Sequence, residues 1–274
     1  MSLLRDIPGL GTTWFCKFFE PVDSKEVRTL LTTEIEDFEE RYSRFREDSL
    51  LSRLNRTKVL ADPPADLVTM CTLGLEYYRR TQGLFNIGTE THQRAQGYDV
   101  DYTFAPHPEL DPVTLDLSQA LRVSPRKITL DPRVTLDLGG LGKGFFIDKI
   151  SNLLQSKLKL RYFVINGGGD IYATSDHNAP VKTYLRDPEN PARALQPVSL
   201  RNQALCGSSP VLRRWRDKTH LLNPLNPAKP VTRSAFVIAS TATEADILAT
   251  VATLAEESEM QRIIANTNVD YLVC

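Results

Sequence analysis

Asp137-Leu138-Gly139-Gly140-Leu141-Gly142-Lys143-Gly144 is the stretch that decides how this chain is interpreted. It follows two short β-like runs, 127–130 and 134–136, and precedes a helical pattern at 145–154. A strand, a glycine turn and a helix in this order are typical of phosphate sites, because glycine lets the backbone approach an anion and a helix N-terminus presents free N–H groups. Lys143 adds a positive charge at the same end. The stretch therefore predicts that a phosphorylated molecule binds here.

Two familiar phosphate-binding motifs do not fit this stretch. A P-loop needs glycine in place of Asp137 and a hydroxyl residue in place of Gly144. A dinucleotide fingerprint that begins at Gly140 needs a third glycine in place of Phe145. Most glycine turns before helices bind no ligand, so the function of this turn depends on the other segments of the chain.

The bulk composition describes an ordinary globular protein. The chain has 274 residues, 41% of them hydrophobic, and a net charge of −1. That charge gives no general attraction to nucleic acid or to an anionic membrane, so we expect neither as a partner. The length suits one domain over residues 1–274.

The cysteines and the apolar runs bear on the compartment. Four cysteines form no C-x-x-C pair, which favours reduced thiols in a reducing compartment. The first residues lack the apolar core of a signal peptide, and no apolar run has the length of a membrane span. We expect a cytoplasmic protein without a membrane span, unless a leader has been removed.

Short strands and helices alternate irregularly along the chain, which predicts an α+β fold. Residues 90–118 read as a loop-like surface flap, and 204–209 as a turn of small residues. The predicted strands are 11–19, 127–130, 134–136, 161–165, 171–173, 182–185, 198–200, 234–239 and 269–274. The predicted helices are 24–41, a short one within 42–55, 65–82, 145–154, 242–255 and one near 258.

Asp246 and Thr250 form a candidate cation site. They are four residues apart on a predicted helix, so a carboxylate and a hydroxyl share one face. Such oxygens suit a hard cation such as Mg²⁺, which usually keeps substrate phosphates among its ligands. The alternative is an exposed Asp and a Thr that bonds to its own helix backbone, and without context that alternative is far more common.

Three further features suggest chemistry, each with a plain structural alternative. Asn166-Gly167-Gly168-Gly169-Asp170 at a strand end suits contact with a nucleotide, or is a tight turn between paired strands. His220 suits proton transfer near neutral pH, or is a hydrogen-bonded structural histidine. Phe45 suits stacking on a planar ring, or is an ordinary core aromatic.

Taken together and in order, these segments resemble the ApbE family of FAD:protein FMN transferases over nearly the whole chain. The segment 43–55 is similar to S-x-[aromatic]-x-x-x-S-x-[LI]-S-x-[LF]-N, and the central stretch to D-L-G-G-[IL]-[AG]-K-G. The other matching segments are 11–14, which resembles the opening strand, 83–87 (G-x-F-[DN]-[IP]), 166–170 (N-x-G-G-[DN]), 220–224 (H-[IL]-[IL]-[DN]-P) and 243–250 (T-x-A-D-x-x-[AS]-T).

The resemblance implies an α+β fold of mixed or antiparallel sheets with packed helices in two interlocked lobes. It also implies that FAD is a substrate whose pyrophosphate is cleaved with a divalent cation, usually Mg²⁺. FMN would pass to a threonine or serine of an acceptor flavoprotein, and AMP would leave.

The resemblance assigns expected roles to residues of this chain. Asp246, Thr250 and the Gly142 carbonyl would hold the metal, and His220, Lys143 and Asp246 would be catalytic. The expected contacts to FAD are Phe45, Gly139, Gly140, Lys143, Asp148, Asn166, Gly168, Gly169, Asp170 and Ser208.

The chain departs from the family pattern at four places. Gly142 stands where alanine is usual, Asn223 replaces a more usual aspartate, and Cys206 begins a segment that is usually [TS]-G-[DS]. Residues 88–95 replace the usual T-x-x-P-L. Two alternatives therefore stay open: an FAD pyrophosphatase that releases FMN and AMP, and a flavin-binding protein without turnover.

Overall fold

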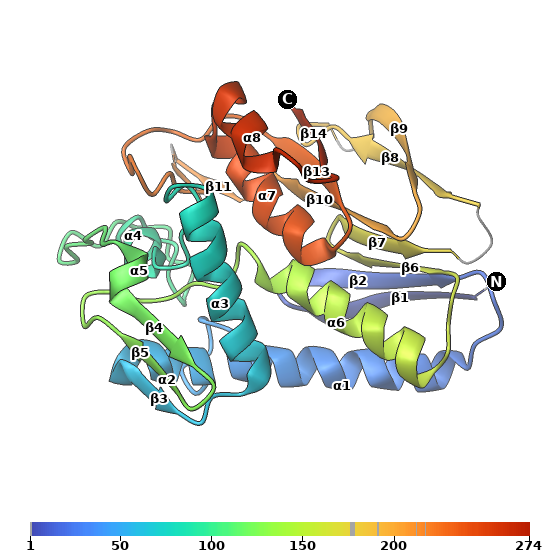
Figure 1. Cartoon of the computed structure of the whole chain (residues 1–274), viewed down its shortest axis with the longest axis horizontal. Coiled ribbons are helices and arrows are strands. Elements are labelled where there is room, and N and C mark those ends of the chain that lie inside the picture. The colour runs from blue at the N-terminus through green and yellow to red at the C-terminus, as the bar shows by residue number, and fades with distance from the viewer. Residues whose placement is uncertain (1, 176–178, 191, 212, 217) are drawn as a thin grey trace.

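A seven-stranded antiparallel sheet forms one end of the molecule (Figure 1). The computed structural model describes residues 2–175, 179–190, 192–211, 213–216 and 218–274. Neighbouring strands of this sheet are joined by antiparallel ladders. In spatial order the strands are β1 (Ser2–Gly9), β2 (Thr12–Phe18), β6 (Phe163–Gly167), β7 (Asp170–Thr174), β10 (Gln203–Ser208), β13 (Ala235–Ala239) and β14 (Asp270–Val273).

Both faces of the large sheet are covered. Helices α1 (Ser24–Tyr42), α6 (Gly142–Lys157) and α7 (Ala242–Leu254) contribute to a large hydrophobic core on one face, with α8 (Glu257–Ile264) beside them. The hairpin of β8 (Val181–Arg186) and β9 (Ala194–Leu200) adds a smaller apolar cluster on the other face.

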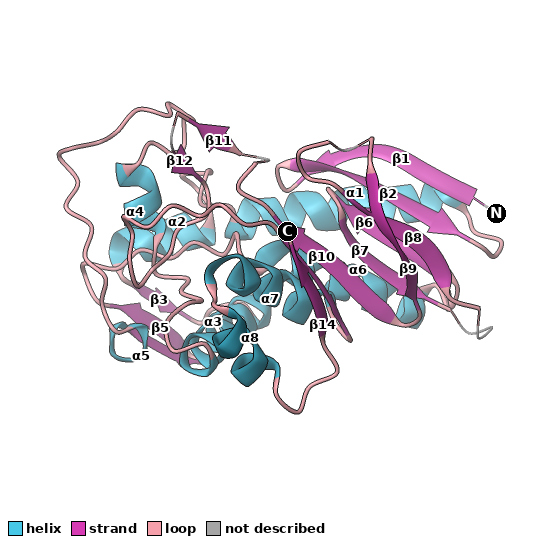
Figure 2. Ribbon diagram, turned by 90° about the horizontal axis from the view of Figure 1, so that it is seen from above, coloured by secondary structure: helices cyan, strands magenta, loops and turns pink. Residues whose placement is uncertain are grey.

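A second part of the chain builds around a three-stranded sheet at the opposite end (Figure 2). Its strands are β3 (Val59–Ala61), β5 (Lys127–Leu130) and β4 (Leu121–Ser124), in that order. Helices α2 (Leu50–Thr57), α3 (Ala65–Arg80), α4 (Glu90–Ala95) and α5 (Leu117–Ala120) surround it, and the short strands β11 (Arg214–Trp215) and β12 (Lys218–Thr219) pair nearby.

The two parts share one continuous hydrophobic core. It extends from Ile128 and Leu60 in the small sheet to Trp14 and Phe163 in the large one. The α+β prediction is confirmed, and the helices cross between the two parts as expected for interlocked lobes. The single domain over 1–274 agrees with this shared core and stays a prediction.

Most of the predicted elements form for the expected local reasons. Helix α1 begins after Asp23, whose carboxylate accepts hydrogen bonds from the N–H groups of Lys25 and Glu26. Its apolar residues Val27, Leu31, Ile35 and Phe38 recur at the helical spacing and are buried.

Two sequence predictions near the central stretch are wrong. Residues 134–136 form no strand, because the side-chain amide of Asn55 takes the place of a partner strand. Asn55 Oδ1 accepts from Leu136 N at 2.7 Å, and Asn55 Nδ2 donates to Leu136 O at 2.9 Å. Residues 204–209 are mostly strand β10 and not a turn. Small residues occur there because α7 packs directly on this strand.

Other elements gave no clear signal. The strands β1, β3, β4, β11 and β12 were not predicted, and the expected flap 90–118 contains α4 and the first two residues of α5. These elements are short or lie at edges, where hydrophobic periodicity is too brief to read.

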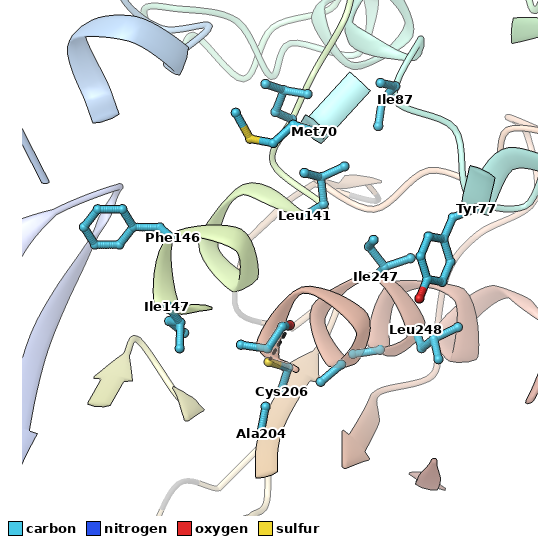
Figure 3. Packing of buried hydrophobic residues seen from close by; sticks show 14 of the residues in the cluster. Met70, Tyr77, Ile87, Leu141, Phe146, Ile147, Ala204, Cys206, Ile247 and Leu248 are labelled. Carbon is cyan, nitrogen blue, oxygen red and sulfur yellow. Dashed lines mark hydrogen bonds between the residues drawn. The ribbon is translucent and has the colours of Figure 1, made fainter. Parts of the chain in front are cut away.

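The contact between α6 and α7 places the central stretch. Figure 3 shows Leu141, Phe146 and Ile147 on the α6 side, Ile247 and Leu248 on α7, and Ala204 and Cys206 of β10 beneath α7. Gly144 permits the close approach, since a Cβ there would lie 2.3 Å from Ala242 O and 2.8 Å from Asp246 Cβ.

Replacement of Gly144 by alanine is expected to destabilise the protein by about 1–3 kcal/mol, because the added methyl group must push α7 away. Gly142 is the matched control: a Cβ there meets nothing closer than Phe38 Cε1 at 3.9 Å, so alanine is expected to be neutral or slightly stabilising. Urea denaturation of both variants measures the difference. Equal stabilities would contradict the packing described here.

Candidate active site

A cavity of about 690 Å³ lies beside the glycine turn. A volume of this size suits a cofactor or a drug-sized ligand. Its walls come from the central stretch, α7, the end of β10, the turn between β6 and β7, and the segments around Phe45 and His220. The expected site residues that line it are Phe45, Gly139, Gly140, Gly142, Lys143, Gly168, Asp170, Ser208, His220, Asp246 and Thr250.

Lys143 and two buried carboxylates form the charged centre of the cavity. Lys143 Nζ forms a short ion pair with Asp170 and lies 3.9 Å from Asp246 Oδ1. Burial lowers the pKa of Lys143, but the two carboxylates outweigh that effect, so the net pKa is raised and the ammonium persists at neutral pH. The second oxygen of Asp170 accepts from Gly207 N at 3.0 Å, which ties this centre to the end of β10.

Asp246 also caps helix α6. Its Oδ2 accepts from Gly144 N at 2.9 Å, whereas Leu141 at the N-cap offers no side-chain bond. Burial raises the pKa of Asp246 to about 6, and Lys143 acts in the opposite direction. Asp246 Oδ2 is thus engaged by the backbone, whereas Oδ1 lies 3.9 Å from the Lys143 ammonium.

The donors around Asp246 are hard oxygens. Thr250 and Gly142 line the same cavity, and a Cβ on Gly140 would lie 3.9 Å from the Thr250 hydroxyl, so the glycine turn passes beside it. Within the described residues, no group of three or more His, Cys, Asp or Glu side chains could hold a metal by itself. The donor set matches the type that Mg²⁺ prefers, and phosphate or water oxygens would have to complete it.

His220 lies at the wall of the cavity as a neutral imidazole. Its Nδ1 is 3.4 Å from Arg213 O. Burial, and then the Arg213 guanidinium, lower the pKa of His220 to about 4. A neutral ring at physiological pH is able to accept a proton, which is the form that a general base needs.

Aromatic rings gather around Phe45. The Arg44 guanidinium lies 4.2 Å from the Phe45 ring centre, and Tyr102 stacks on Phe45 with ring centres 5.0 Å apart. Arg44 is nearly buried and is held by Asp137 at 3.3 Å and Glu90 at 3.9 Å. This end of the cavity is therefore suited to a planar ring.

Three of the expected contact residues do not line the cavity. Asn166 Oδ1 accepts from Gly169 N at 2.9 Å and closes the turn between β6 and β7, so both residues shape the turn. Asp148 accepts from Ala242 N and Thr243 N, both at 2.8 Å, and from the Thr243 hydroxyl. Asp148 thus anchors the start of α7, the helix that carries Asp246, and contacts no part of the cavity.

Several cavity residues escaped the sequence analysis. Gln93 of α4 and Tyr98 and Tyr102 of the following loop all line the cavity, although the flap carried no motif. Arg213 donates to the Tyr98 hydroxyl and to Gly11 O, and so joins segments far apart in the sequence. The one available signal was the departure from the family pattern at 88–95, which marks a wall peculiar to this chain.

The sequence model of the ApbE family matches residues 10–273. The chain belongs to the ApbE family. This ApbE chain is 23% identical over 295 residues to the FAD:protein FMN transferase of Haemophilus influenzae, covering 96% of this chain and 84% of that protein. It is also 23% identical over 208 residues to the FAD:protein FMN transferase of Vibrio cholerae, covering 70% of this chain and 60% of that one.

Solved structures of ApbE proteins share the fold. The flavin transferase ApbE from Vibrio cholerae superposes with a TM-score of 0.81 at 19% identity, over 99% of this chain and 93% of that chain. The ApbE protein from Thermotoga maritima gives a TM-score of 0.85 at 18% identity, with the same coverage. At these identities the likeness shows the architecture alone.

None of the helices in the described part of this ApbE chain is long and apolar enough to cross a membrane. Its cysteines are unpaired, and Cys206 beside the charged centre is buried. Burial raises the pKa of the Cys206 thiol, so it stays protonated and acts as a small packed side chain.

Proposed function

We propose that this protein is an FAD:protein FMN transferase. One cavity combines a glycine turn at a helix N-terminus, the Lys143 ammonium, the Asp246 carboxylate and a neutral His220. That combination carries the proposal, because pyrophosphate cleavage needs positive charge along the phosphates and transfer needs a base for the incoming hydroxyl. The names of the curated relatives support the same assignment.

In the proposed reaction, the hydroxyl oxygen of an acceptor threonine or serine attacks the phosphorus of the FMN half. The bond from that phosphorus to the bridging oxygen breaks, and AMP departs with the electron pair. His220 takes the hydroxyl proton, so FAD and the alcohol give the FMN phosphoester and AMP in balance. Lys143 and the turn at 139–144 orient the phosphates and offset their charge.

We further propose that the metal is a hard divalent cation such as Mg²⁺, held by Asp246, Thr250 and the Gly142 carbonyl. When bound it supplies charge neutralisation to the pyrophosphate. Asp246 lines the cavity and its Oδ2 is used by Gly144 N, so Oδ1 is the oxygen that we propose binds the cation. The acceptor flavoprotein and the cytoplasmic location stay predictions from the sequence.

The competing activity is FAD hydrolysis, in which water replaces the acceptor hydroxyl. Incubation with FAD and Mg²⁺, with or without a flavoprotein-derived peptide containing one threonine, separates the two when AMP is quantified by chromatography. Transfer is expected to make AMP release depend on the peptide and to stop when EDTA removes the cation. AMP at the same rate without peptide indicates a pyrophosphatase, and FAD retained without AMP indicates a binding protein.

A further inference from the structure

A two-stranded hairpin carries His220 to the cavity. Its strands β11 and β12 have two residues each and form a sheet of their own, and His220 follows directly after β12. An isolated two-stranded hairpin, even a longer one, is at best marginally stable in water. The position of the His220 imidazole therefore depends on what this hairpin packs against.

Trp215 docks the hairpin on α4 and on the loop that follows α4 (Figure 2). Trp215 is 7% exposed, and its Nε1 donates to Gln96 O at 3.0 Å, at the end of α4. Its ring stacks on Tyr98 with ring centres 5.6 Å apart, and the Phe104 ring lies 5.3 Å from it. A buried indole whose N–H is also bonded is a strong anchor for so short a hairpin.

Contacts from the docked hairpin reach the imidazole. Arg213 precedes β11, and its guanidinium donates to the Tyr98 hydroxyl at 2.5 Å. The Arg213 carbonyl accepts from His220 N at 3.3 Å and lies 3.4 Å from His220 Nδ1. From α4, Gln93 Nε2 donates to His220 O at 3.3 Å. The backbone on both sides of the imidazole is thus held by the helix and the loop on which Trp215 packs.

The same helix and loop are tied to the central stretch. The Arg44 guanidinium donates to Tyr98 O at 3.1 Å, and it is paired with Asp137 at 3.3 Å and with Glu90 at 3.9 Å. Asp137 begins the central stretch, and Glu90 begins α4. A continuous set of contacts therefore runs from the turn that we propose holds the phosphates to the hairpin that carries the proposed base.

We propose that Trp215 is a positioning residue for flavin transfer, which holds the His220 imidazole at the place from which it reaches the acceptor hydroxyl. Trp215 lines no part of the cavity, so it acts through the residues that it holds. Misplacement of a catalytic group by about 1 Å costs roughly a hundredfold in rate. The inference rests on the proposed function, in which His220 is the base.

A double-mutant cycle tests whether Trp215 acts through His220. Single-turnover transfer of FMN to a threonine peptide is measured at saturating FAD, Mg²⁺ and peptide for the parent, Trp215→Ala, His220→Ala and the double variant. Trp215→Ala is expected to slow transfer by roughly tenfold to a hundredfold in the parent, and by less than about twofold in the His220→Ala background. A general structural loss would slow transfer alike in both backgrounds.

Arg214→Ala is the matched control. Arg214 precedes Trp215 on β11, is exposed and lines no part of the cavity, so this variant is expected to transfer FMN within about twofold of the parental rate. Trp215→Phe keeps a stacking ring but loses the hydrogen bond to Gln96 O. It is expected to slow transfer by about threefold, which is less than the effect of alanine.

Limited digestion with trypsin measures the docking of the hairpin without any activity. The bonds after Arg213, Arg214, Arg216 and Lys218 are trypsin sites in or beside the hairpin. Trp215→Ala is expected to be cut at these sites about tenfold faster than the parent, because the undocked hairpin is open to the protease. Cleavage elsewhere is expected to keep the parental rate, whereas a misfolded variant would be cut along the whole chain.

Equal slowing by Trp215→Ala in both backgrounds, or no slowing at all, would overturn the inference. So would a parent whose hairpin is cut as fast as that of Trp215→Ala, since Trp215 would then not dock it. A parent that transfers no FMN, with Trp215→Ala still cut faster at the hairpin, removes the proposed function and leaves the positioning of His220 by Trp215 standing.

Discussion

Replacement of Asp246 by asparagine is expected to reduce AMP release from FAD by about a thousandfold. Asparagine has nearly the same shape and still accepts the bond from Gly144 N, so the cap of α6 is kept. What it removes is the charge that faces Lys143 and that we propose binds the cation. AMP release at saturating FAD and Mg²⁺ measures the effect.

The stability of the same variant separates a functional role from a structural one. Since burial raises the pKa of Asp246 from 3.8 to about 6, folding favours its protonated form. The carboxylate therefore opposes folding increasingly as the pH rises from 3.8 through about 6, and it does so in full at neutral pH. At pH 7.5 the melting temperature of the Asp246→Asn variant is expected to equal or exceed that of the parent protein.

Glu244→Gln is the matched control on the same helix. Glu244 accepts from Tyr77 and pairs with Arg80 outside the cavity, so its loss is expected to cost some stability and little activity. An Asp246→Asn variant that releases AMP at the parental rate would remove Asp246 from the metal site.

Replacement of His220 by alanine is expected to slow flavin transfer by roughly a hundredfold to ten-thousandfold while FAD binding changes little. The imidazole is neutral above about pH 4, because burial and Arg213 lower its pKa, so it is in the base form throughout the physiological range. Single-turnover transfer to a threonine peptide gives the rate, and flavin fluorescence gives the affinity.

His92→Asn provides the comparison for His220. His92 is buried, but its Nε2 lies 3.1 Å from the Thr114 hydroxyl and it lines no part of the cavity. This variant is expected to transfer FMN at close to the parental rate. If His220→Ala does so as well, the base must be another group.

The sequence predicted the parts of the site that lie in short, dense motifs. The glycine turn, Lys143, Asp246, Thr250 and His220 all line one cavity, although Lys143 and Asp246 are more than one hundred residues apart. Glycine runs and helical i, i+4 spacing are local signals, so they are readable before the fold is known.

The roles of the other residues could not be predicted from the sequence because they depend on tertiary contacts. Asp148 is an acidic residue close to the central stretch and was expected in the site. Only the packing of α6 against α7 shows that it caps α7. Asn55 takes the place of a strand partner for Leu136 across the chain, and no local pattern marks it. Gln93 likewise becomes a cavity residue only because α4 packs against the segment of His220.

Mass spectrometry of the acceptor tests the central claim most directly. The protein is incubated with FAD, Mg²⁺ and a flavoprotein-derived peptide that contains one threonine, beside the same peptide with alanine in that position. We expect the threonine peptide alone to gain one FMN through a phosphoester on that residue, with one AMP released for each adduct. Release of AMP and free FMN from both mixtures, with no adduct, would contradict the transferase assignment and leave a pyrophosphatase.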